Sequence, residues 1–217
     1  MKTVSIPCGD SFVSGRLIGA TDPGTPGVLL AHGAGTNQDH PMMVAIRDGI
    51  AAAGFPVLTF NYEYTEAGKK RPDSPKRLLA CHAEAARWFR QEVHPQMVMA
   101  GRSMGGRIAS MLAAEGEECS GLMLFSYPLH PAGRPEKLRK DHLPDIAVPV
   151  LSIVGTRDAL ATPALYDQWV RPLPNFTTFD SEDADHSMRV RKASGRTNEE
   201  ALTEMIQAAT DWLRNHN

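Results

Sequence analysis

The chain lacks long apolar runs, an even set of cysteines and any marked excess of one charge. No apolar run approaches the ~20 residues that a membrane helix needs, and residues 1–10 contain no apolar core of a signal peptide. The formal net charge of -2 gives no global field that would recruit nucleic acid or an anionic membrane. We therefore expect a cytoplasmic protein that binds a small molecule, with no nucleic-acid or membrane partner. Its oligomeric state is not predicted.

Cysteine is scarce and irregularly placed. Cys8, Cys81 and Cys119 are widely separated and have no C-x-x-C spacing, which indicates reduced thiols instead of a disulfide framework or a zinc site. A dinucleotide-binding fingerprint is also missing, since Gly33 and Gly35 follow an apolar run without the third glycine. The sequence predicts neither a metal nor an organic cofactor.

Short apolar runs bounded by turn residues alternate with longer amphipathic segments. Such runs are typical of parallel strands buried on both faces, and they lie at residues 28–31, 57–60, 97–100, 122–125 and 150–154, with a weaker run for an edge strand at 176–179 and a candidate antiparallel hairpin at 3–18. Helical spacing follows at residues 42–53, 75–90, 104–114 and from about 197 to 213. This alternation predicts an α/β fold, a three-layer α/β/α sandwich with a mostly parallel sheet, as one domain over residues 1–217. Residues 126–148 are too few for a cap domain.

The segment Gly101-Arg102-Ser103-Met104-Gly105-Gly106 fits the pattern G-x-S-x-G. It directly follows one apolar run and precedes a helical stretch, which is the strand, tight turn and helix context of a nucleophile elbow. Its glycines leave room where backbone segments pass close to one another. We therefore predict Ser103 as a nucleophile, with the N–H of Met104 at the helix start as an oxyanion donor.

A second motif, His32-Gly33-Ala34-Gly35, ends the first buried run. A loop at this place can supply the other oxyanion donor. We assign that donor to the N–H of Ala34, with Gly35 as the alternative. His32 precedes the nucleophile in the chain and is interpreted as a support for the loop.

Asp158 and His186 complete the predicted catalytic set. Asp158 follows the run at 150–154, and His186 lies in the loop after the weak strand, so the chain order Ser, Asp, His is that of an elbow serine with its partners. His186 would take the Ser103 proton, and Asp158 would fix the imidazole. Asp183 and Asp185 remain alternatives to Asp158, and the competing histidines are His94, His130, His142 and His216.

Taken together, these blocks resemble the α/β-hydrolase superfamily, in its dienelactone-hydrolase-like branch. A closer resemblance is to predicted hydrolases that include the testis-expressed hydrolase-like proteins and a subunit of the nonspecific-lethal chromatin complex. It rests on His32-Gly33-Ala34-Gly35, Phe60-Asn61-Tyr62, residues 101–107, residues 127–131, residues 134–139 and Asp185-His186. Dienelactone hydrolases proper use a cysteine where this chain has Ser103, so the resemblance implies the fold and acyl-transfer chemistry but not the substrate.

The expected function is a serine hydrolase of carboxylesterase type, acting on small carboxylic esters or related acyl compounds through an acyl-enzyme. The alternatives are an acyltransferase with the same residues and a non-catalytic scaffold or binding protein. We expect an open, fairly polar site bordered by residues 61–64. Arg102 would meet an anionic group of the substrate or pair with a carboxylate.

Overall fold

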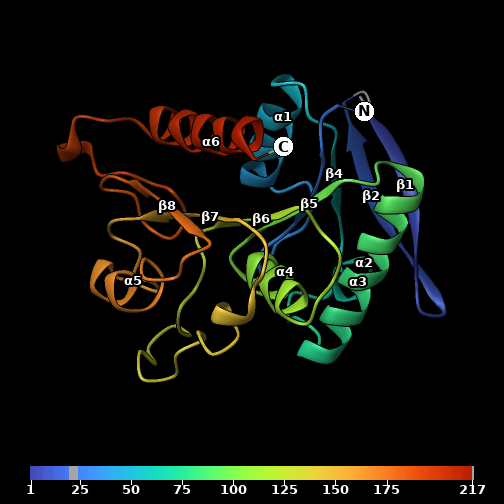
Figure 1. The fold of residues 1–217 in the computed structure, drawn as a ribbon, viewed down its shortest axis with the longest axis horizontal. Coiled ribbons are helices and arrows are strands. Elements are labelled where there is room, and N and C mark those ends of the chain that lie inside the picture. The colour runs from blue at the N-terminus through green and yellow to red at the C-terminus, as the bar shows by residue number, and fades with distance from the viewer. Residues whose placement is uncertain (20–23, 217) are drawn as a thin grey trace.

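The computed structural model describes residues 1–19 and 24–216, and its centre is one eight-stranded sheet (Figure 1). The strand order is β1-β2-β4-β3-β5-β6-β7-β8. The strands are β1 (Lys2–Cys8), β2 (Ser11–Ile18), β3 (Gly27–Ala31), β4 (Val57–Phe60), β5 (Met97–Arg102), β6 (Gly121–Phe125), β7 (Val150–Gly155) and β8 (Phe176–Ser181).

The sheet is parallel from β4 to β8 and antiparallel only at the β1 edge. β1 pairs with β2 and β2 with β4 in antiparallel register, while every other neighbouring pair is parallel. Every residue of β3, β4, β6 and β7 is buried, as expected for strands covered on both faces. The predicted hairpin and the predicted edge strand β8 are both present.

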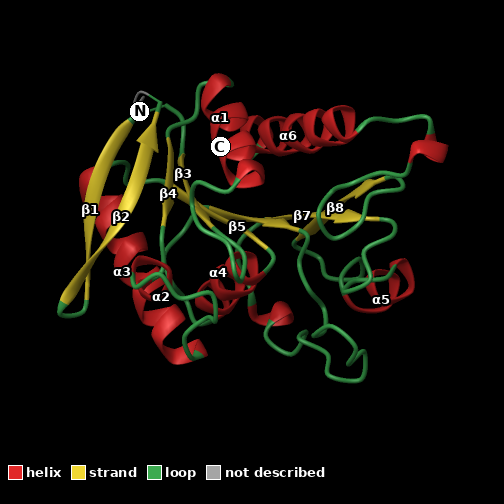
Figure 2. Cartoon of the chain, turned by 180° about the vertical axis from the view of Figure 1, so that it is seen from behind, coloured by secondary structure: helices red, strands yellow, loops and turns green. Residues whose placement is uncertain are grey.

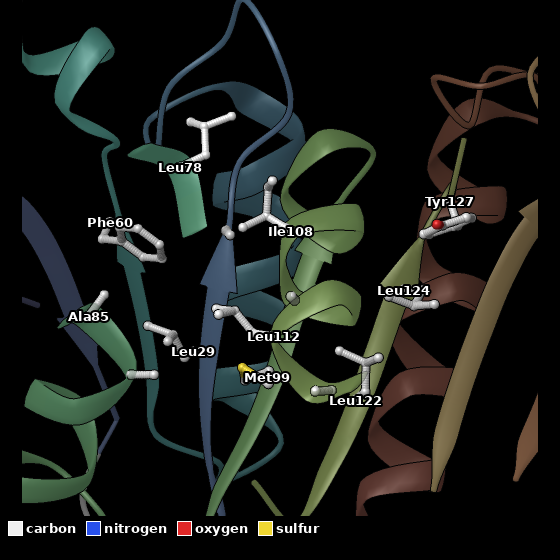
Figure 3. Packing of buried hydrophobic residues seen from close by; sticks show 14 of the residues in the cluster. Leu29, Phe60, Leu78, Ala85, Met99, Ile108, Leu112, Leu122, Leu124 and Tyr127 are labelled. Carbon is white, nitrogen blue, oxygen red and sulfur yellow. The ribbon is translucent and has the colours of Figure 1, made fainter. Parts of the chain in front are cut away.

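Helices cover the two faces of the sheet and produce three layers (Figure 2). One face carries α1 (Pro41–Ala52) and α6 (Asn198–Asn215), and the other carries α3 (Pro75–Glu92), α4 (Met104–Ala114) and the short α5 (Pro163–Trp169). Each face has its own buried cluster. Figure 3 shows the cluster under α3 and α4, where Leu29, Met99 and Leu122 from the sheet pack against Ile108 and Leu112 of α4.

Local signals position the helix ends. Thr197 caps α6 through a capping box, because its hydroxyl accepts the N–H of Glu200 while the Glu200 carboxylate accepts the N–H of Thr197. Proline occupies the first turn of α1 and of α3, where its missing N–H costs nothing. The predicted bounds of these helices therefore lie within about two residues of those observed.

Sequence periodicity missed α2 (Glu63–Glu66), α5 and two 3-10 turns, Leu143–Asp145 and Lys192–Ser194. Each is too short for a repeating pattern to be detected. Between β6 and β7 the chain contains only the first of these turns, so the part of the chain that the structure describes has no separate cap domain. Across residues 1–19 and 24–216, no helix combines the length and apolarity needed to cross a bilayer.

Candidate active site

Ser103 lies in the turn between β5 and α4, in a backbone conformation unusual for a residue with a side chain. Its φ of 52° and ψ of -112° fall outside the left-handed helical region that non-glycine residues occasionally occupy. The turn is held on both sides, since the Ser103 N–H donates to Phe125 O at 2.9 Å and the Arg107 N–H donates to Ser103 O at 3.0 Å. The Ser103 side chain is thereby displayed at the start of α4.

The glycines of this turn allow backbone segments to approach one another closely. A Cβ on Gly101 would lie 2.3 Å from the Gly105 carbonyl carbon, and a Cβ on Gly105 would lie 2.3 Å from Ala31 O. Real Cβ atoms do not approach that closely. Helix α4 can therefore pack against β3 and β5 only because these positions lack side chains.

Ser103, His186 and Asp158 form a continuous hydrogen-bonded chain. The Ser103 Oγ lies 2.9 Å from His186 Nε2, and His186 Nδ1 lies 2.7 Å from Asp158 Oδ2. Both distances are within hydrogen-bond reach for a nucleophile, a base and an orienting carboxylate. The Asp158 side chain is buried, whereas the His186 side chain retains 22% exposure.

Asp158 is fixed through both carboxylate oxygens. Its second oxygen, Oδ1, accepts the Leu160 N–H at 2.8 Å. Asp183, one alternative to Asp158, instead binds Arg191, whose hydrogen bonds hold the pKa of the Asp183 carboxyl below its ordinary value. Asp185, the other alternative, accepts the N–H groups of Ser187 and Arg189 at 2.7 and 3.0 Å. These two carboxylates shape the loop that carries His186.

This loop packs directly on the turn that follows β7. The Arg157 N–H donates to Ala184 O at 2.9 Å, and the Asp183 N–H donates to Thr156 Oγ1 at 2.8 Å. A Cβ on Gly155 would lie 2.2 Å from Ala184 O, so this glycine also permits a close backbone approach. In the sequence, Gly155 stands in the segment before Asp158, but the close approach of the loop from residue 184 could not be predicted from that position.

Arg102 has a different role from either one predicted. Its guanidinium donates to the backbone carbonyl of His186 at 2.9 Å and to Ser187 Oγ at 3.4 Å, and no described carboxylate pairs with it. Burial lowers the pKa of Arg102, and the charges of Asp158 and Asp185 oppose that shift. Arg102 thus connects the strand before Ser103 to the loop that carries His186.

The other histidines make hydrogen bonds elsewhere. His130, one of the competing histidines, is buried, with only 4% of it exposed. Their hydrogen-bond partners include Gln96 O for His94, Pro131 O for His130, Ser110 Oγ for His142 and Trp212 O for His216. Among the described residues, only His186 is hydrogen-bonded to Ser103.

His32 supports the loop that follows β3. It is fully buried, and burial lowers its pKa to about 4, so the ring is neutral at pH 7. Because the Tyr62 N–H donates to Nε2 at 3.3 Å, the proton resides on Nδ1, which donates to Gly33 O at 2.9 Å. This contact holds the backbone immediately before Ala34.

A cavity of about 350 Å³ opens beside Ser103. Ala34 and Met104, the predicted oxyanion donors, both line it, and the first-turn N–H groups of α4 have no acceptor within the helix. Its remaining wall combines apolar residues with three charged ones, and consists of Pro72, Asp73, Pro75, Leu78, Arg107, Pro128, Pro131, Ala132, Arg139 and Leu160.

Residues 61–64 do not line this cavity, so the prediction that they border it is wrong. Tyr62 and Tyr64 are buried with His32 and His82 in an aromatic cluster, where the Tyr62 hydroxyl lies 3.1 Å from His82 Nδ1. Tyrosine rings of this size are more stable packed in the core than at an open rim. Among the described residues, no group of three or more His, Cys, Asp or Glu side chains is arranged to hold a metal ion.

Known proteins place this architecture in a family. Residues 24–214 match the family described as the alpha/beta hydrolase domain. Similar solved structures include an alpha-beta serine hydrolase homologue from Coxiella burnetii (TM-score 0.76, 13% identity, covering 97% of this chain and 96% of the other). A second is Est1E from Butyrivibrio proteoclasticus with ferulic acid bound (TM-score 0.77, 14% identity, covering 98% of this chain and 98% of the other). A third is dienelactone hydrolase from Anabaena variabilis (TM-score 0.75, 22% identity, covering 99% of this chain and 97% of the other). The chain has the α/β-hydrolase fold, and it belongs to the alpha/beta hydrolase family.

Proposed function

We propose that this protein is a serine hydrolase that cleaves small carboxylic esters through an acyl-enzyme. The observation that carries the proposal is the chain from Ser103 Oγ to His186 Nε2 at 2.9 Å and from His186 Nδ1 to Asp158 Oδ2 at 2.7 Å, beside a cavity. Family membership supports a hydrolase, and the resemblance to a serine hydrolase homologue and a dienelactone hydrolase is consistent with acyl chemistry.

In the acylation step, Ser103 Oγ attacks the ester carbonyl carbon while its proton passes to His186 Nε2. The carbonyl oxygen becomes an oxyanion, which the N–H groups of Met104 and Ala34 stabilise at the cavity wall. The tetrahedral intermediate then collapses, the C–O bond to the alcohol breaks, and His186 returns the proton to the departing alkoxide. Asp158 keeps the imidazole in the reactive tautomer and stabilises its charged form.

Deacylation repeats these proton transfers with water. His186 removes a proton from a water molecule, the hydroxide attacks the acyl carbon, and the proton then returns to Ser103 as the acid leaves. The same acyl-enzyme could be captured by an alcohol or amine, which is the acyltransferase alternative. Competition between water and an added alcohol acceptor distinguishes the two reactions.

The size and walls of the cavity support a small acyl substrate. A space of about 350 Å³ is at the lower end of ligand pockets. Pro75, Leu78 and Leu160 offer apolar contacts, and the chain between β6 and β7 forms no cap that would enclose a long lipid tail. We expect activity to fall for straight acyl chains beyond about eight carbons, because the cavity then leaves the chain end in water.

The test combines turnover and covalent labelling. The wild type should hydrolyse 4-nitrophenyl acetate and butyrate and should gain one fluorophosphonate adduct by intact mass, and Ser103→Ala should lose both. Ser110→Ala is the matched control, because Ser110 Oγ also contacts a histidine, His142 Nε2 at 2.8 Å, but does not occupy the elbow. Ser110→Ala should therefore keep labelling and turnover.

A folded wild type that shows neither labelling nor turnover would contradict the hydrolase and favour the scaffold alternative. The resemblance to the chromatin-complex subunit makes that alternative worth testing. Labelling at Ser103 without turnover would leave the nucleophile in place and contradict the small-ester specificity.

A further inference from the structure

Two arginine side chains line the cavity beside Ser103. Arg107 lies one turn after Ser103 on α4, and its N–H donates to Ser103 O at 3.0 Å. Residues four apart on a helix share a face, so Arg107 extends along the same wall as the nucleophile.

Arg139 reaches the cavity from the segment between β6 and β7. Its backbone is held at both polar groups, because its N–H donates to Leu129 O and its carbonyl accepts the Tyr127 hydroxyl, each at 2.7 Å. Tyr127 and Leu129 are buried. Arg139 is thus anchored to the core at its backbone while its side chain faces the cavity.

Neither guanidinium is paired with another residue that the structure describes. Within residues 1–19 and 24–216, the side chains of Arg107 and Arg139 make no ion pair and donate no hydrogen bond, and Arg107 Nε is buried without an acceptor. Arg90 and Arg16 are also partly buried, yet each has a carboxylate partner, Glu117 at 2.8 Å and Asp39 at 3.3 Å. Arg102 has a backbone partner instead, the His186 carbonyl at 2.9 Å. Arg107 and Arg139 are partly buried, and a charged group that is partly withdrawn from water without a partner is destabilising.

Other charged groups near the cavity do not neutralise the pair. Asp73 lines the same cavity, but within the described residues its ion pair is with Arg77, at 3.9 Å. His142 contacts Ser110 and adds no negative charge. Burial lowers the pKa of Arg139, and the charge of Arg107 contributes to the same shift.

We propose that Arg107 and Arg139 form an anion subsite, so that the preferred substrate is an ester that also carries a free carboxylate. This inference rests on the proposed function and names its substrate class. A carboxylate accepts two hydrogen bonds from a guanidinium in a planar pairing. A monoanion suits the site better than a doubly charged phosphate, because Asp73 lines the same cavity and would repel the additional charge.

The test uses pairs of esters that differ only in charge. Mono-4-nitrophenyl adipate is compared with its methyl ester, which places the charge on the acyl side, and 4-acetoxybenzoate with its methyl ester, which places it on the leaving group. The wild type should prefer the charged member of at least one pair in kcat/KM. Arg107→Met and Arg139→Met keep the apolar stem and should each reduce that preference about 10- to 100-fold, the range for a hydrogen bond to a charged group.

Arg134→Met is the matched control, because Arg134 belongs to the same segment as Arg139 but is exposed and does not line the cavity. It should leave both the preference and the hydrolysis of the neutral esters unchanged. For Arg107→Met and Arg139→Met, the preference is the kcat/KM for the charged ester divided by the kcat/KM for the neutral ester of the same variant. Since Arg107 has no partner to lose, Arg107→Met should also unfold at or above the wild-type temperature, which a purely structural arginine would not.

A separate binding measurement distinguishes the two proposals. Calorimetric titration of Ser103→Ala with monomethyl adipate should show binding that weakens at least tenfold in the Ser103→Ala, Arg107→Met double variant. Turnover without charge preference in either pair would overturn the subsite and leave the hydrolase. Arginine-dependent binding without any turnover in the wild type would support the subsite and contradict the hydrolase, and the absence of both would overturn both.

Discussion

The strained turn at Ser103 allows a prediction about stability that does not depend on the reaction. The Ser103 backbone has φ 52° and ψ -112°, a combination that strains a residue with a Cβ but that glycine adopts without strain. We predict that Ser103→Gly is more stable than Ser103→Ala, although alanine is the better residue in almost every regular element. Both variants lose the hydroxyl and its contact with His186 Nε2, so their comparison isolates the backbone.

The magnitude follows from two opposing contributions. A sparsely populated backbone conformation costs about 1–3 kcal/mol, which glycine removes, while the greater freedom of glycine in the unfolded chain costs about 0.5–1 kcal/mol. The glycine variant should therefore exceed the alanine variant by about 1 kcal/mol in free energy of unfolding. For a chain of this size, that is about 2–4 °C in Tm.

Urea unfolding of both variants, followed by tryptophan fluorescence, measures the difference. Met111, in the interior of α4, provides the control. There the order should reverse, with Met111→Gly less stable than Met111→Ala by about 1 kcal/mol. If Ser103→Gly proves less stable than Ser103→Ala while the Met111 pair behaves as expected, the turn is not strained and the reasoning fails.

Three further predictions follow from the site. Asp158→Asn should reduce kcat about 10⁴-fold with little change in KM, as the same exchange does in serine-protease triads, because the amide favours the wrong imidazole tautomer; a loss below tenfold would point to another orienting group. Gly105→Ala should destabilise the fold by about 1–3 kcal/mol or more, since its Cβ would lie 2.3 Å from Ala31 O, and an unchanged urea midpoint would contradict the close packing of α4 on β3. For His32, burial lowers the pKa from 6.5 to about 4, so the unfolded chain binds the proton more readily. The contribution of neutral His32 to the free energy of unfolding is roughly 3 kcal/mol, at about 1.4 kcal/mol per pKa unit. It should be complete above pH 6.5 and decline as the pH falls toward 4. His32→Asn should remove this part of the dependence of the urea midpoint on pH.

The strands and main helices were predictable because their signals are local. β3, β4, β6 and β7 are continuous apolar runs with turn residues at both ends, and burial on both faces is the only stable arrangement for them. The elbow is local in the same sense. Gly101, Ser103 and Gly105 span one turn, so their spacing alone indicates how the serine is displayed.

The partners of Ser103 could be nominated from the sequence but not brought together by it. His186 is 83 positions from Ser103 and 28 from Asp158, and their approach depends on β5, β6, β7 and β8 being neighbours in the sheet. The catalytic roles of the three side chains stay predictions until labelling and turnover are measured.

The sequence by itself determined the α/β layering and the turn that displays Ser103, because both follow from residue patterns within a few positions. Only the tertiary structure decided what distant side chains contact. It gave Arg102 a backbone carbonyl 84 positions away as its partner, packed Tyr62 into the core in place of the cavity rim, and brought Arg139 to the same wall as Arg107. The physical reason is that a side chain's partner depends on strand order and loop packing, which bring together residues that no local pattern connects.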